Sequence, residues 1–173
     1  RWLSDWSSDV CSSDLTASNA NGAGVHVSGS DSDRVTIADC DFQACRNGAI
    51  FGWVNSSNKL ENWDVSYNTV NIPTTGTNGA IDLTNMVDST VRNNTVVGGY
   101  CNMILAADAN AGAGPVGTGT VVSNNTLSGA ATGWASITLT CFNVQPLAGV
   151  AILGNVVTPP TSGQGVYMIP NTG

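Results

Sequence analysis

The sequence predicts an all-β fold, a right-handed parallel β-helix in which about five to six coils stack as a solenoid. Three observations predict it. A six-residue unit recurs at intervals of 26 to 31 residues, a second short alternating segment precedes each unit, and no segment has the periodicity of a helix. A left-handed β-helix would instead show short hexapeptide repeats running without gaps, and a β-sandwich would not repeat in register.

The six-residue unit has the pattern apolar, any, any, Asn, any, apolar. It occurs at 65–70, 91–96, 122–127 and 152–157, and a fifth copy at 37–42 has Cys in the Asn position. Asn tolerates a left-handed backbone at a turn, and its amide can both donate and accept hydrogen bonds. We therefore expect a structural ladder from coil to coil, made by Cys40, Asn68, Asn94, Asn125 and Asn155.

The second alternating segment lies upstream of each unit and is usually preceded by Gly. It occurs at 24–27, 48–51, 79–83, 102–105, 134–139 and 165–168. Each period therefore contains at least two strands, separated by turns rich in Gly, Asn, Ser and Asp. A single coil cannot bury its inward side chains alone, so stacking closes an apolar column. We expect this column to contain Val35, Ile37, Val65, Val91, Val122 and Ile152.

The first fifteen residues differ in character from the repeat. Residues 5–15 read as the translation of a common sequencing-library adapter, and a genuine Ser/Asp-rich leader is the alternative. The chain also starts with Arg1 rather than Met and stops just after a strand-like segment. We expect residues 1–15 to be an adapter-derived, disordered segment and residues 16–173 to be a fragment of a β-helix.

The composition excludes some partners. The formal net charge is −7 and only five residues are Lys or Arg, so the chain lacks the cations on which nucleic-acid binding depends. No apolar run is long enough to span a bilayer. A surface rich in Asn, Ser, Thr and Gly is typical of extracellular proteins that handle glycans. The expected location is therefore secreted or cell surface; the oligomeric state does not follow from the sequence.

Leaving out Cys11, the four cysteines that remain would permit two disulfides in an oxidising compartment. The alternative is buried thiols that pack as small hydrophobic groups, and we favour it because Cys40 lies in the expected ladder. No cysteine pair has the spacing of a metal site.

The paired strands and the asparagine ladder, over about residues 21–170, resemble the pectate-lyase-like superfamily of right-handed β-helices. The resemblance implies a protein that binds a polysaccharide and processes it as a lyase, a hydrolase or an epimerase. It is a resemblance to an architecture rather than to one enzyme family, and the Asp-Asp and Gly-His-Gly motifs of the polygalacturonase group are absent. The alternative function is a non-catalytic solenoid of an adhesin or a phage tail-spike.

Enzymes of this superfamily act in a groove along the outside of one sheet, so outward-facing positions are the candidates. Strand alternation directs His26, Phe51, Trp53, Asp82 and Tyr167 outward from successive coils. We expect the three aromatic side chains to bind substrate, and His26 and Asp82 to be catalytic. The alternative is that the aromatic rings only cover the sheet and that the imidazole is an ordinary surface group.

A second expected catalytic group lies on another sheet. Lyases of the superfamily need a cation to neutralise a uronate carboxylate, and Arg92 could serve, although a surface ion pair with Asp64 is the alternative. Asp31 and Asp33 could offer oxygens to Ca²⁺, but such residues in a Gly/Ser turn are more often turn formers. Glu61 is the only Glu, and no convincing carboxylate pair for a glycosidase is visible.

Deletion of residues 1–15 tests the adapter interpretation. A segment that contributes nothing to the fold can be removed without loss, so the shortened chain should unfold at the same temperature as the full chain. Thermal unfolding followed by circular dichroism measures this. A large drop in melting temperature would refute the interpretation.

Overall fold

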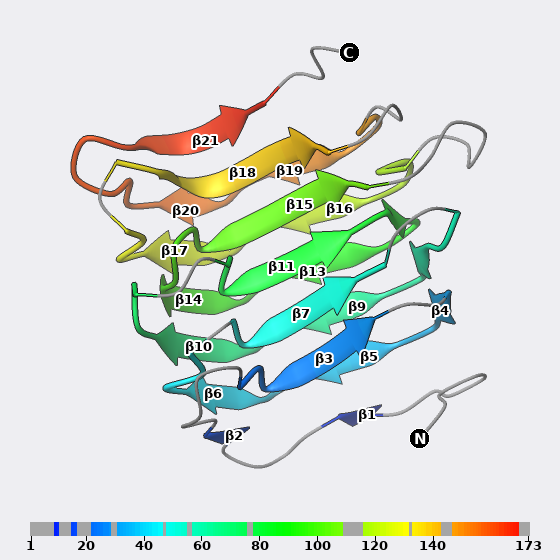
Figure 1. The fold of residues 1–173 in the computed structure, drawn as a ribbon, viewed down its shortest axis with the longest axis horizontal. Coiled ribbons are helices and arrows are strands. Elements are labelled where there is room, and N and C mark those ends of the chain that lie inside the picture. The colour runs from blue at the N-terminus through cyan, green and yellow to red at the C-terminus, as the bar shows by residue number, and fades with distance from the viewer. Residues whose placement is uncertain are drawn as a thin grey trace.

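The computed structural model describes residues 9–10, 15–16, 22–28, 31–46, 48–54, 57–75, 78–108, 116–131, 133–142 and 147–169, with only the backbone for the first two pairs. All regular elements in these ranges are strands, which form parallel sheets (Figure 1). The chain runs through the sheets in the same order in each coil, so that strands one period apart become hydrogen-bonded neighbours. This is a parallel β-helix, as the repeat predicts.

Three sheets have six strands each, and a fourth is short. Sheet I contains β3 (Val25–Ser28), β7 (Ile50–Trp53), β11 (Ile81–Thr84), β15 (Met103–Ala107), β18 (Ala135–Cys141) and β21 (Gln164–Met168). Sheet II contains β1 (Asp9–Val10), β5 (Thr36–Ala38), β9 (Asp64–Ser66), β13 (Thr90–Arg92), β16 (Val121–Ser123) and β19 (Ala151–Leu153). Sheet III contains β2 (Leu15–Thr16), β6 (Asp41–Gln43), β10 (Thr69–Ile72), β14 (Thr95–Gly98), β17 (Thr126–Ser128) and β20 (Val156–Val157). Sheet IV contains β4 (Ser32–Asp33), β8 (Leu60–Glu61) and β12 (Met86–Val87).

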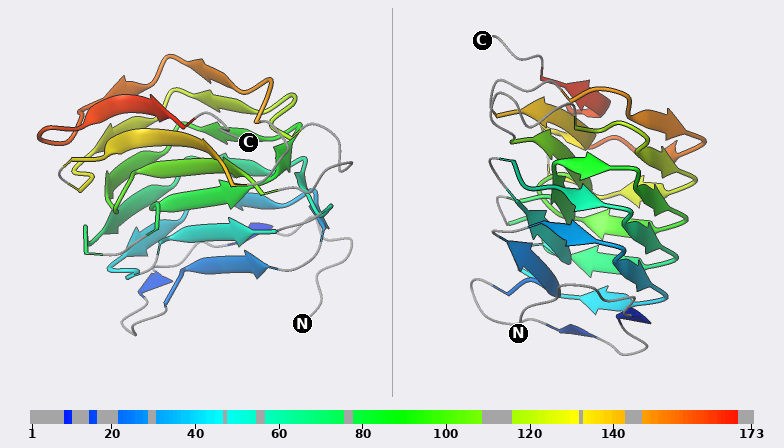
Figure 2. Two further views of the ribbon diagram at one scale, coloured as in Figure 1. Left: turned by 45° about the horizontal axis from the view of Figure 1, so that its top comes forward. Right: turned by 90° about the vertical axis from the view of Figure 1, so that its right-hand side faces the viewer.

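The coils stack as successive layers along the solenoid (Figure 2). From β3 to β18 the chain completes about four turns with a closed core. The next turn, through β19 and β20 to β21, is only partly covered, because its inward-facing Ile152 and Val157 are half-buried and Val166 and Met168 are exposed. The number of well-packed turns is therefore slightly lower than the five to six expected.

The core is a set of columns in which equivalent residues of successive coils lie over one another. In sheet II the column holds Ile37, Val65, Val91, Val122 and Ile152, as predicted. Val35, also expected there, is buried but lies before β5 and outside this column. Sheet III adds Phe42, Val70, Val96, Leu127 and Val157. Sheet I adds Val25, Ile50, Ile81, Met103, Ile137 and Val166. Burial of apolar surface stabilises a fold by about 25 cal/mol per Å², so these columns supply the main driving force for stacking.

The five ladder residues lie at the turn between sheets II and III and connect coil to coil. In each step the side-chain oxygen of one Asn accepts both the backbone N–H and the amide Nδ2 of the Asn below. For Asn94 these distances are 3.0 Å and 2.9 Å from Asn68. The Nδ2 of Asn94 donates to Val65 O and to Asn125 Oδ1, each at 2.9 Å. The buried polar groups of the turn are thus satisfied by the neighbouring coils.

Two features of the ladder add to the sequence prediction: the contact that Cys40 makes at one end, and the position of the left-handed residue in each turn. At one end Cys40 donates its backbone N–H to Asn68 Oδ1 at 3.1 Å. The left-handed residue is not the ladder residue itself but the one before it, with φ of 58° at Tyr67, 56° at Asn93 and 55° at Asn124. This residue reverses the chain, so the two apolar ends of the unit lie on strands of different sheets. Each period accordingly has a third strand that the sequence pattern does not resolve.

Short segments of the first sixteen residues also pair with the solenoid. The backbone of β1 pairs with β5 and that of β2 pairs with β6. The proposed boundary between residues 1–15 and 16–173 and the adapter origin of the first segment stay predictions.

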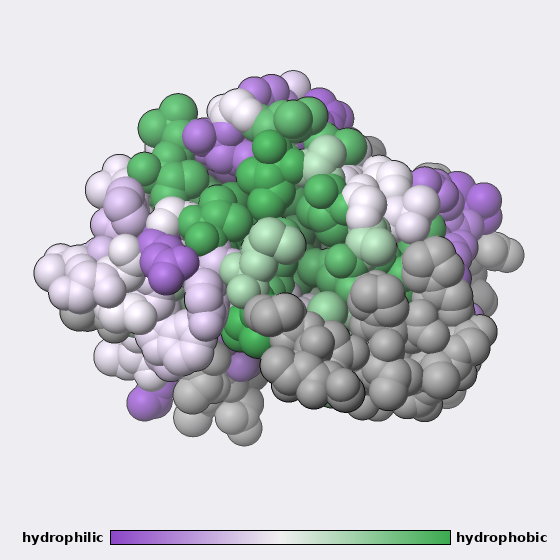
Figure 3. Space-filling view, turned by 90° about the horizontal axis from the view of Figure 1, so that it is seen from above, coloured by the Kyte–Doolittle hydropathy of each residue, from purple (hydrophilic) through white to green (hydrophobic). Residues whose placement is uncertain are grey.

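The C-terminal end of the solenoid is apolar. Viewed down the stack from this end, apolar side chains gather across the last coil (Figure 3). The exposed apolar residues of this coil are Leu153, Val156, Val166 and Met168. Such a surface is what a coil presents when no further coil covers it.

Replacement of Asn94 by Ala tests how much the ladder contributes to stability. The change leaves the Asn68 N–H buried without its acceptor, which costs about 1–3 kcal/mol, and it removes the bonds that Asn94 Nδ2 donates to Val65 O and Asn125 Oδ1, worth about 1 kcal/mol each. We expect the free energy of unfolding in urea to fall by about 3 kcal/mol or more. Thr95→Ala is the control, because Thr95 is adjacent but exposed and should change stability by less than about 0.5 kcal/mol. Equal losses in the two variants would contradict the ladder's role.

Candidate functional site

The outer face of sheet I brings together most of the residues that the sequence singles out. Neighbouring strands place one outward position of each coil in a single column. This column holds His26, Phe51, Asp82, Ile104, Thr138 and Tyr167. Trp53 occupies the next outward position of β7. Only Arg92 of the expected catalytic and substrate-binding residues lies elsewhere.

Four aromatic rings form a continuous row on this face. The centroid of His26 lies 5.0 Å from that of Phe51, which stacks on Trp53 at 5.9 Å with an interplanar angle of 13°. The row continues from Trp53 to Phe142, whose centroids are 5.5 Å apart. His26 and Phe142 are exposed, whereas Phe51 and Trp53 are half-buried. The rings therefore cover part of the sheet and also present an aromatic surface.

The contact between Trp53 and Phe142 crosses two strands of the sheet. Their strands, β7 and β18, are separated by β11 and β15, which corresponds to about 14 Å at the usual strand spacing. A centroid distance of 5.5 Å means that the two rings lean toward each other across the intervening strands. Asp108, which follows β15, accepts a hydrogen bond from the Trp53 side chain. Burial raises the pKa of Asp108, and the bond from Trp53 opposes that shift.

Asp82 lies in the expected column, but it is not exposed as expected. Its side chain is 2% accessible, because the neighbouring strands and turns pack over the middle of the column. Gly79 N–H donates to Oδ2 at 3.4 Å, while Oδ1 has no hydrogen-bond partner among the described residues. Burial raises the pKa of Asp82 to about 7, against the weaker opposing effect of the Gly79 bond. A bound ligand cannot touch this carboxyl without a rearrangement.

Asp82 belongs to a buried polar group behind the outer face. The Cys101 thiol lies 3.3 Å from the Thr138 hydroxyl, and burial raises the pKa of Cys101, an effect that nearby Asp82 reinforces. The thiolate is thus disfavoured, and Cys101 is an inert packing group. Cys101 and Cys141 are free thiols, whereas the thiols of Cys40 and Cys45 are buried and donate to Ala38 O and Gln43 O.

Arg92 lies on the outer face of sheet II, remote in the fold from the aromatic row. Its Nη2 forms an ion pair with Asp64 Oδ2 at 2.9 Å, and its guanidinium lies 5.4 Å from the centroid of the Tyr67 ring. Burial alone would raise the pKa of Asp64, but hydrogen bonds from Arg92 and Thr90 hold it below its usual value. The structure therefore contains the ion pair that was the alternative for Arg92, and it does not bring Arg92 to the other candidates.

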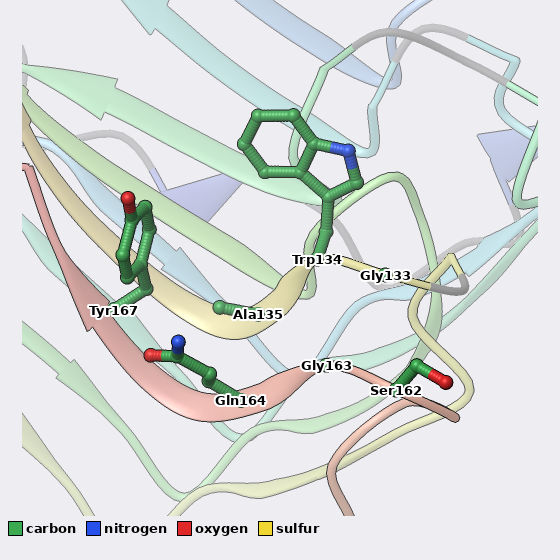
Figure 4. Close-up of a pocket in the computed structure, with 7 residues that line it drawn as sticks. All are labelled: Gly133, Trp134, Ala135, Ser162, Gly163, Gln164 and Tyr167. Atoms are coloured by element: carbon green, nitrogen blue, oxygen red, sulfur yellow. The ribbon is translucent and has the colours of Figure 1, made fainter.

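Tyr167 contributes to a pocket of about 270 Å³ at the start of β18 and β21. Its lining is Gly133, Trp134, Ala135, Ser162, Gly163, Gln164 and Tyr167. Figure 4 shows the Trp134 indole and the Tyr167 ring projecting to the same side of these strands. Trp134 is also in contact with Tyr100, at a centroid distance of 4.7 Å. The pocket is aromatic, and no lining residue is charged.

The two Asp residues considered for Ca²⁺ make contacts between turns. Asp31 Oδ1 accepts Lys59 N–H at 2.7 Å, and Asp33 Oδ1 accepts Asn62 Nδ2 at 2.8 Å. Asp33 also pairs with Arg34 at 3.1 Å. In the described part of the chain, no three His, Cys, Asp or Glu side chains come together as a metal site would require. A calcium requirement stays a prediction from the sequence.

Sequence reasoning missed Asp108, Phe142 and the pair of Tyr100 and Trp134. The alternation of outward residues could have found the first two. The outward positions of β15 are Ile104 and Ala106, and the next one, just after the strand, is Asp108. The outward positions of β18 include Thr138 and Thr140, and the next one, just after the strand, is Phe142. The pair of Tyr100 and Trp134 lies in turns, for which the repeat gives no register.

Comparison with known proteins gives one match. The family model described as a right handed beta helix region matches residues 6–146. Neither the curated proteins nor the solved structures contain a match to the chain. Over the ranges that the structure describes, no helix is long and apolar enough to cross a membrane.

The pH dependence of stability tests the environment of Asp82. Folding raises the pKa of Asp82 from 3.8 to about 7, so the folded state is favoured when this carboxyl is protonated. This contribution to the free energy of unfolding is fully present below about pH 4 and is lost as the pH rises toward 7. Asp82→Asn should therefore become more stable than the parent as the pH rises from 4 to 8, by up to roughly 4 kcal/mol. Asp64→Asn is the matched control and should be less stable than the parent at neutral pH, because folding lowers that pKa. A pH-independent difference for Asp82→Asn would show that the carboxyl is solvated.

Proposed function

Because the chain belongs to the right-handed β-helix family, we propose that this β-helix binds a polysaccharide along the outer face of sheet I. The observation that carries the proposal is the row of four rings on one face, from His26 through Phe51 and Trp53 to Phe142. Aromatic faces pack against the C–H groups of sugar rings, and their polar neighbours bind hydroxyls. The same face carries the pocket beside Tyr167 at its other end.

The dimensions of the face suit an extended chain. Its six strands span roughly 24 Å at the usual spacing, and the aromatic groups lie toward both ends of this length. A glycan laid across the strands would contact His26 and Phe51 at one end of this length and Tyr167 at the other. Secretion or surface display, expected from the composition, would place such a face in contact with polysaccharides.

Processing of the bound chain stays a further prediction, and the geometry supports it less than binding. The carboxyls on this face are Asp82 and Asp108, and Asp108 lies four residues beyond the residue that pairs with Asp82. That offset is about 13 Å along a strand, beyond the roughly 5–9.5 Å that separates the two carboxyls of a glycosidase. Incubation with a polyuronide panel, with absorbance of unsaturated products as readout, tests lyase action directly.

Substitutions in the aromatic row test the proposal. Trp53→Ala and Phe142→Ala should each weaken binding to the preferred polysaccharide by roughly three- to tenfold in affinity gels or calorimetry, because each removes a stacking surface. Phe142 is 54% exposed, so its variant should fold normally even if Trp53→Ala is destabilised.

Tyr67→Ala is the matched control for this experiment. Tyr67 is equally exposed, at 54%, but lies next to sheet II, so its removal should leave binding unchanged. Loss of binding in the control together with the test variants would indicate nonspecific adsorption. Unchanged binding in both aromatic-row variants would contradict the proposal.

A further inference from the structure

We infer that the outer face of sheet I binds an uncharged glycan and discriminates against polyuronates. This inference rests on the proposed function and names its substrate class. It is carried by the positions of the basic residues, by the carboxyls on the face and by the neutral lining of the pocket.

The basic residues lie away from this face. The five are Arg1, Arg34, Arg46, Lys59 and Arg92, and Arg1 lies outside the described residues. Arg34 follows sheet IV and Lys59 precedes β8, while Arg46 follows β6. Arg92 lies on sheet II and is paired with Asp64. The segments 109–115 and 143–146, which follow β15 and β18, contain no Lys or Arg in the sequence. The described part of the face therefore offers no cation to a uronate carboxylate.

The charges that do lie on the face are negative. Asp108 contacts the aromatic row through Trp53, and Asp82 is buried opposite Phe51 on the neighbouring strand. A polyuronate carries one carboxylate on each sugar, so a chain bound over the aromatic row would bring a carboxylate close to Asp108. Like-charge contacts and unpaired desolvated carboxylates are both unfavourable, and they select against such a ligand.

The pocket offers the groups that a neutral sugar needs. Trp134 and Tyr167 provide aromatic surface, and the side chains of Gln164 and Ser162 provide uncharged donors and acceptors (Figure 4). Gly133 and Gly163 leave the wall without side chains. Apolar walls with a few polar groups are typical of small-molecule sites. One sugar unit of an uncharged glycan fits this chemistry.

The test is a binding comparison at low salt and pH 8, which lies above the value of about 7 to which burial raises the pKa of Asp82. The full chain is titrated with neutral hexasaccharides of glucose, xylose, mannose and galactose, and with hexamers of galacturonate and mannuronate. At least one neutral ligand should bind about tenfold or more tighter than either uronate. Each titration is repeated with Ca²⁺, which could bridge carboxylates, and the preference should persist.

Two lysine variants make the comparison sharper. Gln164→Lys places a cation in the pocket and should raise uronate affinity by about tenfold while weakening neutral binding. Ser123→Lys is the matched control, because Ser123 lies on the outer face of sheet II beside Arg92 and should change neither affinity.

The possible results distinguish a failure of this inference from a failure of the proposed function. Uronate binding as tight as neutral binding, with or without Ca²⁺, overturns the inference and leaves the proposed function standing. Equal gains in uronate affinity in Gln164→Lys and Ser123→Lys would show that the pocket does not determine the preference for neutral glycans. Failure to bind any glycan overturns the proposed function itself.

Discussion

Each coil of this protein is held to the next by an amide at the turn between sheets II and III. The side chain of Asn94 bonds to the backbone and the side chain of the coil below and to the side chain of the coil above. Because an amide both donates and accepts, the pattern can repeat without leaving a buried polar group unpaired. The ladder thereby fixes the register in which the apolar columns stack, and a slip of one residue would expose them.

Fixed register decides which side chains meet on the outside. Residues that are 22 to 34 positions apart in the sequence, such as Asp82 and Ile104 or Ile104 and Thr138, become neighbours in one column only because equivalent positions stack. The same constraint gathers rings at His26, Phe51 and Trp53 and keeps the basic residues on other faces. The aromatic outer face of sheet I is thus a consequence of stacking rather than of a separate loop.

The sequence predicts the parts of the structure that repeat. The sheet II column and the outward alternation of sheet I follow from spacing and period alone. The burial of Asp82 does not, because it depends on the packing of neighbouring strands and turns over one position. The contact of Trp53 with Phe142 depends on rings leaning across two strands. The left-handed residue before each ladder position escaped prediction because the residue type there changes from coil to coil, with Tyr at position 67 and Asn at 93 and 124.

Hydrogen exchange measured residue by residue tests the ladder most directly. The amide hydrogens of Asn68, Asn94 and Asn125 are each donated to the side-chain oxygen of the next coil, so they should be among the most slowly exchanging in the chain. The Asn155 amide, for which the described residues provide no acceptor, should exchange faster. Fast exchange at all four positions would mean that the ladder does not hold the coils in register.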